Sequence, residues 1–455
     1  MKGSATTAKG RAAPAGPVRR AWIAGLAWIG TACSGATGSF TNQAESLPFL
    51  AGADMSHLRF FEDRGAVYRR EGTATDALLI LRELGINCIR LRLFTSSAEQ
   101  AAADPYNAIN NLEYTLPLAA RARAAGHRIL LDLHFSDSWA DPGKQRMPSA
   151  WTNLSFEELV LTVRRYTSNV ITAFRQAGAA PEYVQVGNEI TQGMLWPYGH
   201  VGGTNDTPAQ WARLGQLLRS AIQGIRDVQP TGGPAIMIHI DRGGDWSGTQ
   251  WFFDRLRAQN VSYDLIGLSY YPFWHGSLED LRRTLHGAAA RYGKPVVVVE
   301  TAFPFAGGPD VVGIPATTNG QVQYVRALAE VVKGVPGGLG RGIFWWGAEY
   351  QSVPGYRLAG FDRRSLFGPG GEVLPAAAAL GRLTAPVRLE TRRAPDALEL
   401  EWPLSGAGMS LVSTTSLAPH SIWQPVSLPI WEEGLGYRTR LPLEGPAAFY
   451  RLQAN

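Results

Sequence analysis

The sequence predicts an α/β fold, a (β/α)8 barrel followed by a small all-β module. Over most of the 455 residues, short apolar runs with the spacing of buried strands alternate with amphipathic stretches of helical periodicity. This alternation favours a parallel sheet with right-handed crossovers, and eight repeats suffice to close a barrel. A doubly wound open sheet is the alternative, but no Gly-x-Gly-x-x-Gly follows the first predicted strand.

Eight short apolar segments have the pattern of barrel strands. Most are rich in branched aliphatic residues and stop at polar or aromatic residues, as expected of strands that are covered on both faces. In chain order, the predicted strands are 49–56, 87–94, 128–135, 183–190, 235–241, 265–272, 295–301 and 342–350.

Amphipathic helices are predicted between these strands. The first, 75–84, has apolar residues at helical spacing and is closed by Gly85, a residue type common at helix C-termini. Similar apolar stripes predict helices over 116–125, 156–176, 208–228, 278–292 and 320–332. Together, the strands and helices assign residues 48–384 to the barrel.

The character of the sequence changes near residue 386. Helical periodicity ends, and apolar and polar residues alternate in 397–402 and 409–412, with turn-forming residues between these runs. We therefore expect residues 385–455 to form a small β-rich module. It is interpreted as a structural appendage, with a carbohydrate-binding unit as the alternative.

The first 36 residues have the composition of a bacterial export signal. Residues 1–20 contain several Lys and Arg and no acidic residue, 21–32 are apolar, and small residues follow. The apolar run is too short to span a membrane. We expect simple cleavage near Ala36, with a lipoprotein signal at Cys33 as the alternative. We expect export to the medium, the periplasm or a lipid-anchored position on the bacterial cell surface, no transmembrane segment, and a linker over 37–47.

Charge and cysteine content exclude other classes of protein. The chain has 43 Lys and Arg against 38 Asp and Glu, and no basic run interleaved with aromatic residues appears beyond the N-terminus. Nucleic-acid binding is therefore not expected. The two cysteines, Cys33 and Cys88, provide no disulfide framework. We expect a monomer that its packed core stabilises.

Two glutamates stand at the carboxyl ends of predicted strands. Glu189 follows Val-Gln-Val-Gly-Asn, and Glu300 follows four consecutive valines. Either glutamate alone is more often a cap, a salt-bridge partner or a solvated strand end. Because the carboxyl ends of barrel strands meet at one face, we expect the two to lie together as acid/base and nucleophile for cleavage of a glycosidic bond.

The two glutamates are expected to have different roles. Glu300 would be the nucleophile, kept ionised by a neighbouring Arg or Tyr. Glu189 would be the acid/base, with a pKa raised by an apolar site and by the charge of Glu300. Asn188, directly before Glu189, could hydrogen-bond the 2-hydroxyl of the sugar.

Other strand ends offer groups that could hold a polysaccharide. These hydrogen-bonding or stacking side chains are Asp54, Arg90, Arg92, His134, Asp137, Trp139, His239, Tyr270, Tyr271, Trp345 and Trp346. Since alternate residues of a strand point to opposite sides, we expect only one member each of Arg90/Arg92, Tyr270/Tyr271 and Trp345/Trp346 to face the site. The tryptophans would stack on sugar rings.

No metal ion or other cofactor is expected. His134 and His239 are far apart in sequence and form no His-x-His or His-Glu-x-x-His motif, so hydrogen bonding is favoured over metal binding. A metal-dependent hydrolase is kept as an alternative. A structural calcium ion in a long loop also stays open, although Asp310 is isolated among Gly and Pro residues.

Several motifs resemble the endo-β-1,4-galactanases of glycoside hydrolase family 53. They are Gly52-Ala-Asp-Met-Ser56, Leu131-Asp-Leu-His-Phe-Ser-Asp-Ser-Trp-Ala-Asp-Pro-Gly143, Val186-Gly-Asn-Glu-Ile-Thr-Gln-Gly193, Ser269-Tyr-Tyr-Pro-Phe-Trp274 and Val299-Glu-Thr301. The resemblance extends over about residues 48–384 and is most specific in the second motif. Asn-Glu alone indicates only the wider clan of retaining barrel hydrolases.

The resemblance implies a retaining endo-hydrolase of β-1,4-galactan, the side chain of type I arabinogalactan in plant pectin. On this match Glu189 is the acid/base and Glu300 the nucleophile. The loop 302–318 lacks the set of acidic and Asn residues that binds calcium in some bacterial members of the family. Besides the metal-dependent hydrolase, two alternatives remain: another endo-glycanase of the clan, such as a mannanase or β-glucanase, and a catalytically silent, surface-attached glycan-binding protein.

Overall fold

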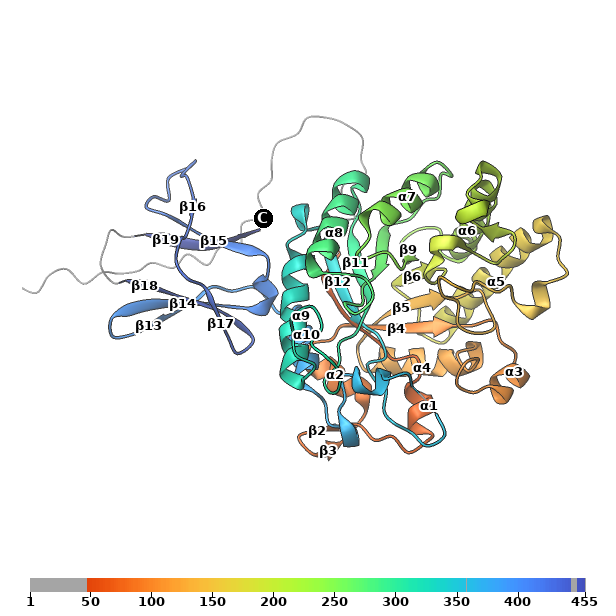
Figure 1. The fold of residues 1–455 in the computed structure, drawn as a ribbon, viewed down its shortest axis with the longest axis horizontal. Coiled ribbons are helices and arrows are strands. Elements are labelled where there is room, and N and C mark those ends of the chain that lie inside the picture. Colours follow the sequence, from red (N-terminus) through yellow and green to blue (C-terminus); the bar gives the residue numbers. More distant parts are fainter. Residues whose placement is uncertain (1–46, 357, 443–447, 455) are drawn as a thin grey trace, which may run out of the picture.

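Eight parallel strands close into a barrel at the centre of the larger part of the molecule (Figure 1). The computed structural model describes residues 47–356, 358–442 and 448–454, so the expected export signal with Cys33 and nearly all of the expected linker lie outside the described residues. The barrel strands are β1 (Leu50–Asp54), β4 (Cys88–Leu93), β5 (Arg128–Leu133), β6 (Tyr183–Val186), β9 (Ala235–Ile240), β10 (Leu265–Ser269), β11 (Val296–Thr301) and β12 (Gly340–Trp345). Their closed order, β1-β12-β11-β10-β9-β6-β5-β4, confirms the predicted barrel.

Most barrel strands end before the predicted segment does. Strand β6 stops at Val186, four residues early, because Gly187 (φ 85°) and Glu189 (φ 48°) have left-handed backbone that does not continue a strand. The polar residues that follow β6 therefore belong to a loop above the barrel, where their side chains can turn toward a site.

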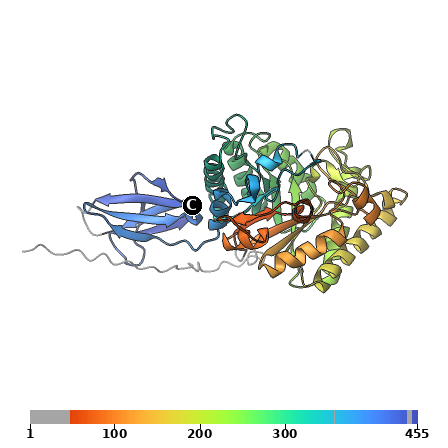
Figure 2. The same cartoon turned by 90° about the horizontal axis from the view of Figure 1, so that it is seen from below.

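Helices follow the strands and cover the outside of the barrel (Figures 1 and 2). They are α2 (Ala77–Glu83), α4 (Leu112–Ala124), α5 (Phe156–Gln176), α6 (Pro208–Val228), α7 (Trp246–Arg257), α8 (Leu278–Tyr292), α9 (Thr318–Lys333) and α10 (Pro375–Arg382). Of these, α7 and α10 lie outside the predicted ranges. Within the described part of the chain, no helix combines the length and the apolar character needed to cross a membrane.

Side-chain caps define where these helices begin. The Asn111 side chain accepts a hydrogen bond from the backbone N–H of Tyr114, so α4 begins at Leu112, four residues before the predicted start. Ser155 and Glu158 form a reciprocal capping box at the start of α5. Shorter elements occupy the loops: α1 (Leu58–Glu62), α3 (Ala98–Ala103), and the strand pairs β2 (Arg69–Arg70) with β3 (Thr73–Ala74) and β7 (Gly193–Met194) with β8 (Gly199–His200).

The inside of the barrel changes from apolar to polar along the strands. An apolar layer is formed by Leu50, Cys88, Leu130, Tyr183, Met237, Leu265, Val297, Val299 and Phe344. Residues two apart on a strand face the same side. Inward positions two or four residues further along the strands therefore carry buried polar groups, namely Asp54, Arg90, Asp132, Gln185, His239 and Ser269. This polar layer lies directly below the carboxyl ends of the strands, where barrel proteins place their functional sites.

The C-terminal part of the chain forms two antiparallel sheets (Figure 1). One has the order β13-β14-β18-β17, and the other has the order β16-β15-β19. Their strands are β13 (Glu390–Arg393), β14 (Ala397–Pro403), β15 (Met409–Thr414), β16 (Gln424–Pro425), β17 (Trp431–Glu433), β18 (Gly436–Pro442) and β19 (Phe449–Ala454). The predicted alternating runs 397–402 and 409–412 lie in β14 and β15, and the all-β character expected here is confirmed.

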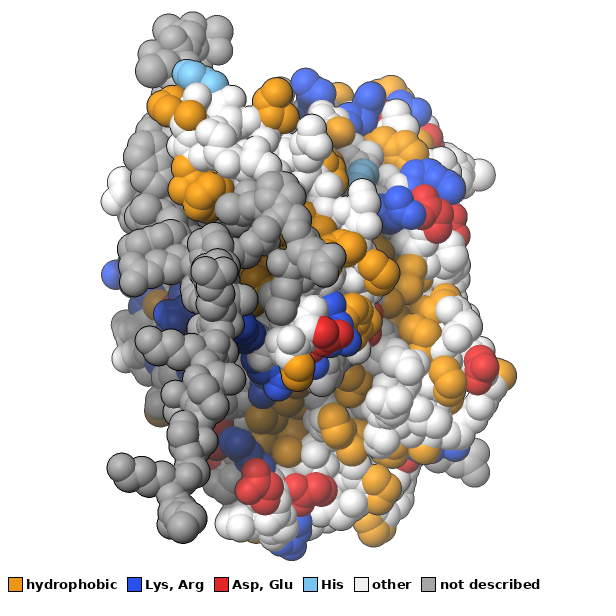
Figure 3. Space-filling model, turned by 90° about the vertical axis from the view of Figure 1, so that its left-hand side faces the viewer, with side chains coloured by type: hydrophobic (Ala, Val, Ile, Leu, Met, Phe, Trp, Pro, Cys, Tyr) orange, Lys and Arg blue, Asp and Glu red, His pale blue; other side chains and the backbone are white. Residues whose placement is uncertain are grey.

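These sheets contact the barrel through helix α9 (Figure 2). Oε2 of Glu330 accepts a hydrogen bond from the backbone N–H of Gly408 at 2.7 Å, and its Oε1 accepts one from the Tyr437 hydroxyl. Arg326, on the same helix, forms an ion pair with Glu432. Figure 3 shows the end of the molecule that the sheets form, where hydrophobic and charged side chains are interspersed.

We expect Gly52→Ala to destabilise the barrel. A Cβ atom at Gly52 would lie 2.1 Å from Cδ1 of Phe344 in the apolar layer, so strand β1 or β12 would have to shift. Overpacking of this kind costs roughly 1–3 kcal/mol, which urea unfolding would measure. The control is Gly143→Ala, whose Cβ would meet only the Asp141 carboxylate, at 3.4 Å. Equal stabilities of the two variants would contradict this packing.

Candidate active site

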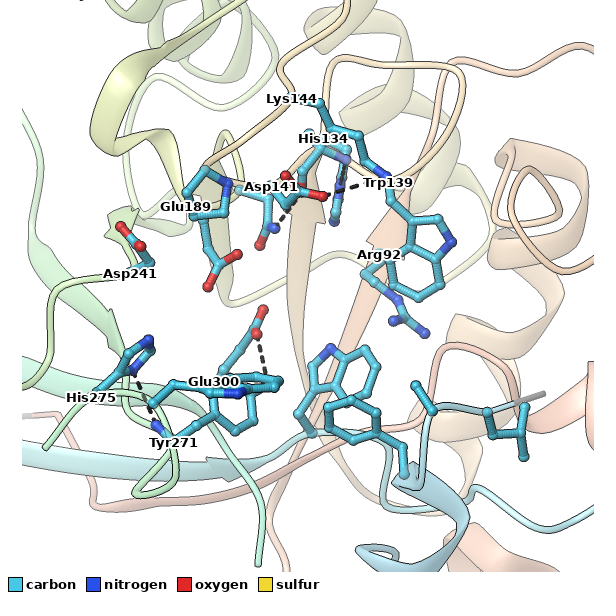
Figure 4. Close-up of a pocket in the computed structure, with 18 of the residues that line it drawn as sticks. Arg92, His134, Trp139, Asp141, Lys144, Glu189, Asp241, Tyr271, His275 and Glu300 are labelled. Carbon is cyan, nitrogen blue, oxygen red and sulfur yellow. Dashed lines mark hydrogen bonds and ion pairs between the residues drawn. The ribbon is translucent and has the colours of Figure 1, made fainter. Parts of the chain in front are cut away.

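A pocket of about 470 Å³ opens at the carboxyl ends of the barrel strands. Figure 4 shows the carboxyl groups of Glu189 and Glu300 pointing toward one another across it, with Arg92 and Trp139 to one side. Eight of the residues singled out in the sequence line the pocket: Arg92, His134, Trp139, Asn188, Glu189, Tyr271, Glu300 and Trp346. The strand ends therefore bring together side chains that are up to 254 positions apart, from Arg92 to Trp346.

Glu189 enters the pocket from a strained turn after β6. Its own backbone is left-handed (φ 48°, ψ 48°), a conformation that is uncommon for a residue with a Cβ atom and that recurs at functional sites. The Ser269 hydroxyl donates a hydrogen bond to Glu189 Oε1 at 2.7 Å. Burial, followed by the negative charge of Glu300, raises the pKa of Glu189 well above its usual range.

Glu300 reaches the pocket because β11 carries one extra residue. Val298 pairs with Leu268, but the next pair along the strands is Glu300 with Ser269, and a matching irregularity occurs on the β12 side. Strict alternation after the inward-facing Val299 would turn Glu300 outward, whereas this bulge keeps it facing inward. The next residue, Thr301, instead contacts the Tyr324 hydroxyl on α9 at 2.6 Å.

The immediate partners of Glu300 differ from those of Glu189. Arg90 Nη2 lies 2.8 Å from Glu300 Oε1, and the Tyr271 hydroxyl donates to Glu300 Oε2 at 2.9 Å. Burial raises the pKa of Glu300, but the Arg90 charge and the Tyr271 hydrogen bond oppose the increase. Among the described residues, no Lys or Arg forms an ion pair with the Glu189 carboxylate. The site therefore favours a proton on Glu189 and a negative charge on Glu300.

Arg90 lies directly below the pocket. Its guanidinium group also lies 2.8 Å from carboxylate oxygens of Asp54 and Asp132, and it donates to the side-chain oxygens of Gln185 and Asn188. All five of these side chains are buried. The Asn188 amide in turn donates to the carbonyl oxygen of Ala140 at 2.8 Å, which fixes its orientation. Charge pairing and hydrogen bonding together offset the cost of burying this cation.

Aromatic side chains and Arg92 form one side of the pocket. The Arg92 guanidinium carbon lies 4.2 Å from the Trp139 ring centroid and 5.4 Å from that of Trp346, so the cation packs against both indoles. Arg92 Nη2 also contacts His57 Nδ1 at 2.6 Å. Burial and the Arg92 charge lower the pKa of His57 to about 3, so this imidazole is neutral at neutral pH.

Residues 50–380 match the family model of Glycosyl hydrolase family 53. The chain belongs to this family. Its relatives include the arabinogalactan endo-β-1,4-galactanase of Humicola insolens, 33% identical over 346 residues that cover 73% of this chain and 98% of the relative. The Aspergillus niger enzyme of that name is 37% identical over 309 residues, covering 65% of this chain and 83% of the relative. An uncharacterised Niallia circulans protein is 44% identical over 313 residues, covering 66% and 83%.

Solved structures of family 53 share the fold. The GH53 catalytic domain of Ignisphaera aggregans has a TM-score of 0.67 and 35% sequence identity, covering 75% of this chain and 98% of that domain. A chain from a study of two fungal β-1,4-galactanases has a TM-score of 0.65 and 29% identity, covering 74% of this chain and 100% of its own length. The resemblance found in the sequence motifs is thereby confirmed.

Six residues expected to contact substrate do not line the pocket of this family 53 protein: Asp54, Arg90, Asp137, His239, Tyr270 and Trp345. Asp54, Arg90 and His239 are buried one layer below it. Asp137 instead holds neighbouring loops, since its carboxylate accepts hydrogen bonds from Thr95, Gln100 and Ser149.

In each of the three candidate pairs, one member lines the pocket. Tyr271 and Trp346 line the pocket, whereas Tyr270 and Trp345 are buried and bond to the carbonyl oxygens of Gly276 and Arg364. Arg90 and Arg92 also divide, but not by alternation, because residues two apart share a face and both enter the barrel. They differ in depth, and only Arg92 lines the pocket.

Other residues in and below the pocket were missed in the sequence. Asp132 and Gln185 are polar residues inside apolar strands, and that signal could have marked them as inward-facing partners of Arg90. The remaining residues come from loops whose position depends on tertiary packing. They include Tyr106, Asp141, Lys144, Asp241, Trp274, His275 and Phe361.

The described residues contain no group of three or more His, Cys, Asp or Glu side chains that could hold a metal ion. His134 instead pairs with Asp132 at 2.9 Å and accepts a hydrogen bond from the backbone N–H of Ala140. In the loop after β11, the exposed Asp310 is the single carboxylate in the sequence 302–317. This loop therefore offers one side-chain carboxylate among the oxygen ligands that calcium takes.

We expect Arg90→Met to lower the free energy of unfolding by roughly 3–5 kcal/mol at pH 8, because three buried carboxylates lose their shared cation. Buried carboxyl groups without a cation have pKa values above those in the unfolded chain. They bind more protons when folded, so stability should recover as the pH falls toward 5.

Urea unfolding of the Arg90→Met variant at pH 5 and pH 8 tests this expectation. The control is Arg164→Met, which removes an exposed ion pair with Asp227 and should change stability little at either pH. If Arg90→Met loses the same stability at both pH values, the carboxylates do not depend on Arg90 in the way described.

Proposed function

We propose that this chain is a retaining endo-β-1,4-galactanase, which hydrolyses β-1,4-galactosidic bonds in the type I arabinogalactan side chains of pectin. The observation that carries the reaction type is the facing pair of Glu189 and Glu300, whose surroundings favour a proton on the former and a charge on the latter. The substrate is supported by the relatives named arabinogalactan endo-β-1,4-galactanase, which match over 346 and 309 residues.

The proposed reaction has two steps. In the first, a Glu300 oxygen attacks the anomeric carbon while Glu189 protonates the departing glycosidic oxygen, giving a covalent glycosyl–enzyme and a shortened glycan. In the second, ionised Glu189 takes a proton from water, and this water attacks the anomeric carbon and releases Glu300. Two inversions retain the anomeric configuration. These steps use only side chains of the chain and water.

The aromatic side of the pocket is proposed to hold the polysaccharide. Trp139 and Trp346 line the pocket beside Arg92, and Trp274 at the pocket is 62% exposed, so flat apolar rings are available to sugar faces. Asn188, whose side-chain oxygen accepts from Arg90, is proposed to bind the 2-hydroxyl next to the reacting carbon.

The remaining assignments are also proposals. We propose that residues 48–384 form the catalytic unit and that 385–455 form an appended β module. Because residues 1–36 have the basic, apolar and small-residue order of an export signal, we further propose that the chain is exported and acts outside the cytoplasm. We also propose that it acts as a monomer.

Activity on a panel of polysaccharides tests the proposed substrate and roles. We expect reducing-sugar release from linear β-1,4-galactan and not from mannan, xylan or β-glucan. Glu300→Gln and Glu189→Gln should each lower this activity by at least about 10³-fold, because each removes a group that acts in the transition state. Glu157→Gln, on the exposed first turn of α5, is the matched control.

The alternatives give different results in the same assay. Release from mannan or β-glucan would keep the reaction and change the substrate. Binding of galactan without release would favour the glycan-binding interpretation. Loss of activity with a chelator would favour the metal-dependent hydrolase.

The pH dependence tests the two roles separately. We expect a bell-shaped profile of kcat/KM, which falls at low pH as Glu300 gains a proton and at high pH as Glu189 loses one. Tyr271→Phe removes a hydrogen bond that lowers the pKa of Glu300, so its acidic limb should move to higher pH.

Tyr270→Phe is the matched control for Tyr271→Phe, because the Tyr270 hydroxyl bonds to the carbonyl oxygen of Gly276, away from the pocket. Its profile should match that of wild type. Equal shifts in the two variants would contradict the assignment of Glu300 as the ionised nucleophile.

A further inference from the structure

A chain of buried side chains connects Glu189 to Arg90 below the pocket. The Ser269 hydroxyl lies 2.7 Å from Glu189 Oε1 and 2.8 Å from His239 Nε2. His239 Nδ1 lies 3.0 Å from Gln185 Nε2, and the Gln185 oxygen accepts from Arg90. Ser269, His239 and Gln185 are each 0% exposed, so their hydrogen bonds are made within the protein rather than with bulk water.

The orientation of Gln185 is fixed by its neighbours. Its side-chain oxygen faces the Arg90 guanidinium, which can only donate, and its nitrogen lies 2.5 Å from Asp132 Oδ1 in a carboxylate that accepts. The nitrogen that faces His239 Nδ1 therefore carries hydrogen. The backbone N–H of Glu189 also points at Nδ1, at 3.4 Å.

The tautomer of His239 follows from these donors. Burial, with the charge of Arg90, lowers the pKa of His239 well below its usual range, so the ring is neutral and carries one proton. Nδ1 faces two donors and one acceptor, Asn188 Oδ1 at 3.2 Å, which already accepts from Arg90 at 2.9 Å. The arrangement places the proton on Nε2, which donates to Ser269. The Ser269 hydroxyl then donates to Glu189.

We infer that Ser269 is a positioning residue that keeps Glu189 Oε1 as a hydrogen-bond acceptor and so confines the transferable proton to Oε2. This inference rests on the proposed role of Glu189 as acid/base. In the first step, the Oε2 proton moves to the glycosidic oxygen as that oxygen takes the electron pair of the breaking carbon–oxygen bond. In the second step, a water proton returns to Oε2.

The direction of a pH shift distinguishes the two His239 tautomers. If Ser269 donates to Glu189, its hydroxyl stabilises the ionised carboxylate, and Ser269→Ala moves the alkaline limb of kcat/KM to higher pH. If His239 instead carries its proton on Nδ1, Ser269 donates to His239 and accepts from protonated Glu189. Ser269→Ala then moves the limb to lower pH, which overturns the inference. The other charged groups that act on Glu189, namely Glu300, Asp241 and Arg90, are unchanged in this variant.

A leaving-group comparison separates positioning from general damage. We expect Ser269→Ala to lower kcat/KM on β-1,4-galactan by on the order of 10-fold, the loss of one well-placed hydrogen bond. On a dinitrophenyl β-1,4-galactobioside, whose leaving group departs without a proton, kcat/KM should stay near wild type. Equal losses on the two substrates would mean a damaged site and overturn the inference.

Further variants keep the test valid if Ser269→Ala folds poorly. Ser269→Thr retains a hydroxyl and should retain the wild-type alkaline limb. Ser220→Ala removes a buried hydroxyl on α6, which bonds to the Val160 carbonyl oxygen, and serves as the control for loss of any buried serine. Thermal unfolding of each variant shows whether it is folded under assay conditions.

A double-mutant cycle tests whether His239 acts through Ser269. His239→Asn removes the Nε2 donor and should move the alkaline limb in the same direction as Ser269→Ala. Combined with Ser269→Ala, it should add little further loss, because the path to Glu189 is already broken. If the losses of kcat/KM in the two single variants add up in the double variant, His239 does not act on Glu189 through Ser269.

Failure of this inference is distinguishable from failure of the proposed function. Wild-type activity in Glu189→Gln would remove the acid/base role and the inference with it. An inactive Glu189→Gln variant, together with an unshifted alkaline limb in Ser269→Ala, would leave the proposed function in place and overturn only the positioning role of Ser269.

Discussion

The structure of the pocket depends on the buried guanidinium of Arg90. This group contacts carboxylates of Asp54, Asp132 and Glu300 at 2.8 Å each, and none of the four is in open solvent. Removing one cation would leave three buried carboxylates without their shared partner, which is more costly than losing an exposed ion pair. The same contact that stabilises the barrel interior also favours the ionised form of Glu300. Arg90 therefore contributes both to the stability of the fold and to the proposed reaction.

Two irregularities of the backbone place the glutamates against each other. The extra residue in β11 keeps Glu300 inside the barrel, and the left-handed turn after β6 directs Glu189 into the pocket. Without the extra residue, the Glu300 side chain would face the helices outside the barrel. Without the left-handed turn, Glu189 would continue strand β6 in the barrel wall. The two carboxyl groups then acquire different pKa values because Arg90 lies at only one of them.

Much of the fold could be predicted because its signals are local. Each strand is a short run of branched apolar residues, and helices such as α5 and α6 repeat apolar residues at helical spacing over their whole length. Site prediction was less complete for a physical reason. The sequence marked the polar strand ends, but the depth of Arg90 and the outward orientation of Tyr270 and Trp345 depend on strand register. Loop residues such as Trp274 and Phe361 carry no periodic signal at all.

The sequence by itself determined the barrel, the all-β character of the C-terminal part, the family motifs and the positions of Glu189 and Glu300 at strand ends, because apolar periodicity and short motifs are properties of neighbouring residues. Only the tertiary structure decided which side chains face the pocket, that Arg90 joins three carboxylates, and that Ser269 and His239 reach Glu189. Those contacts join residues far apart in the chain. Barrel closure, one extra residue in β11 and the burial of charge set their distances, and no local pattern contains that information.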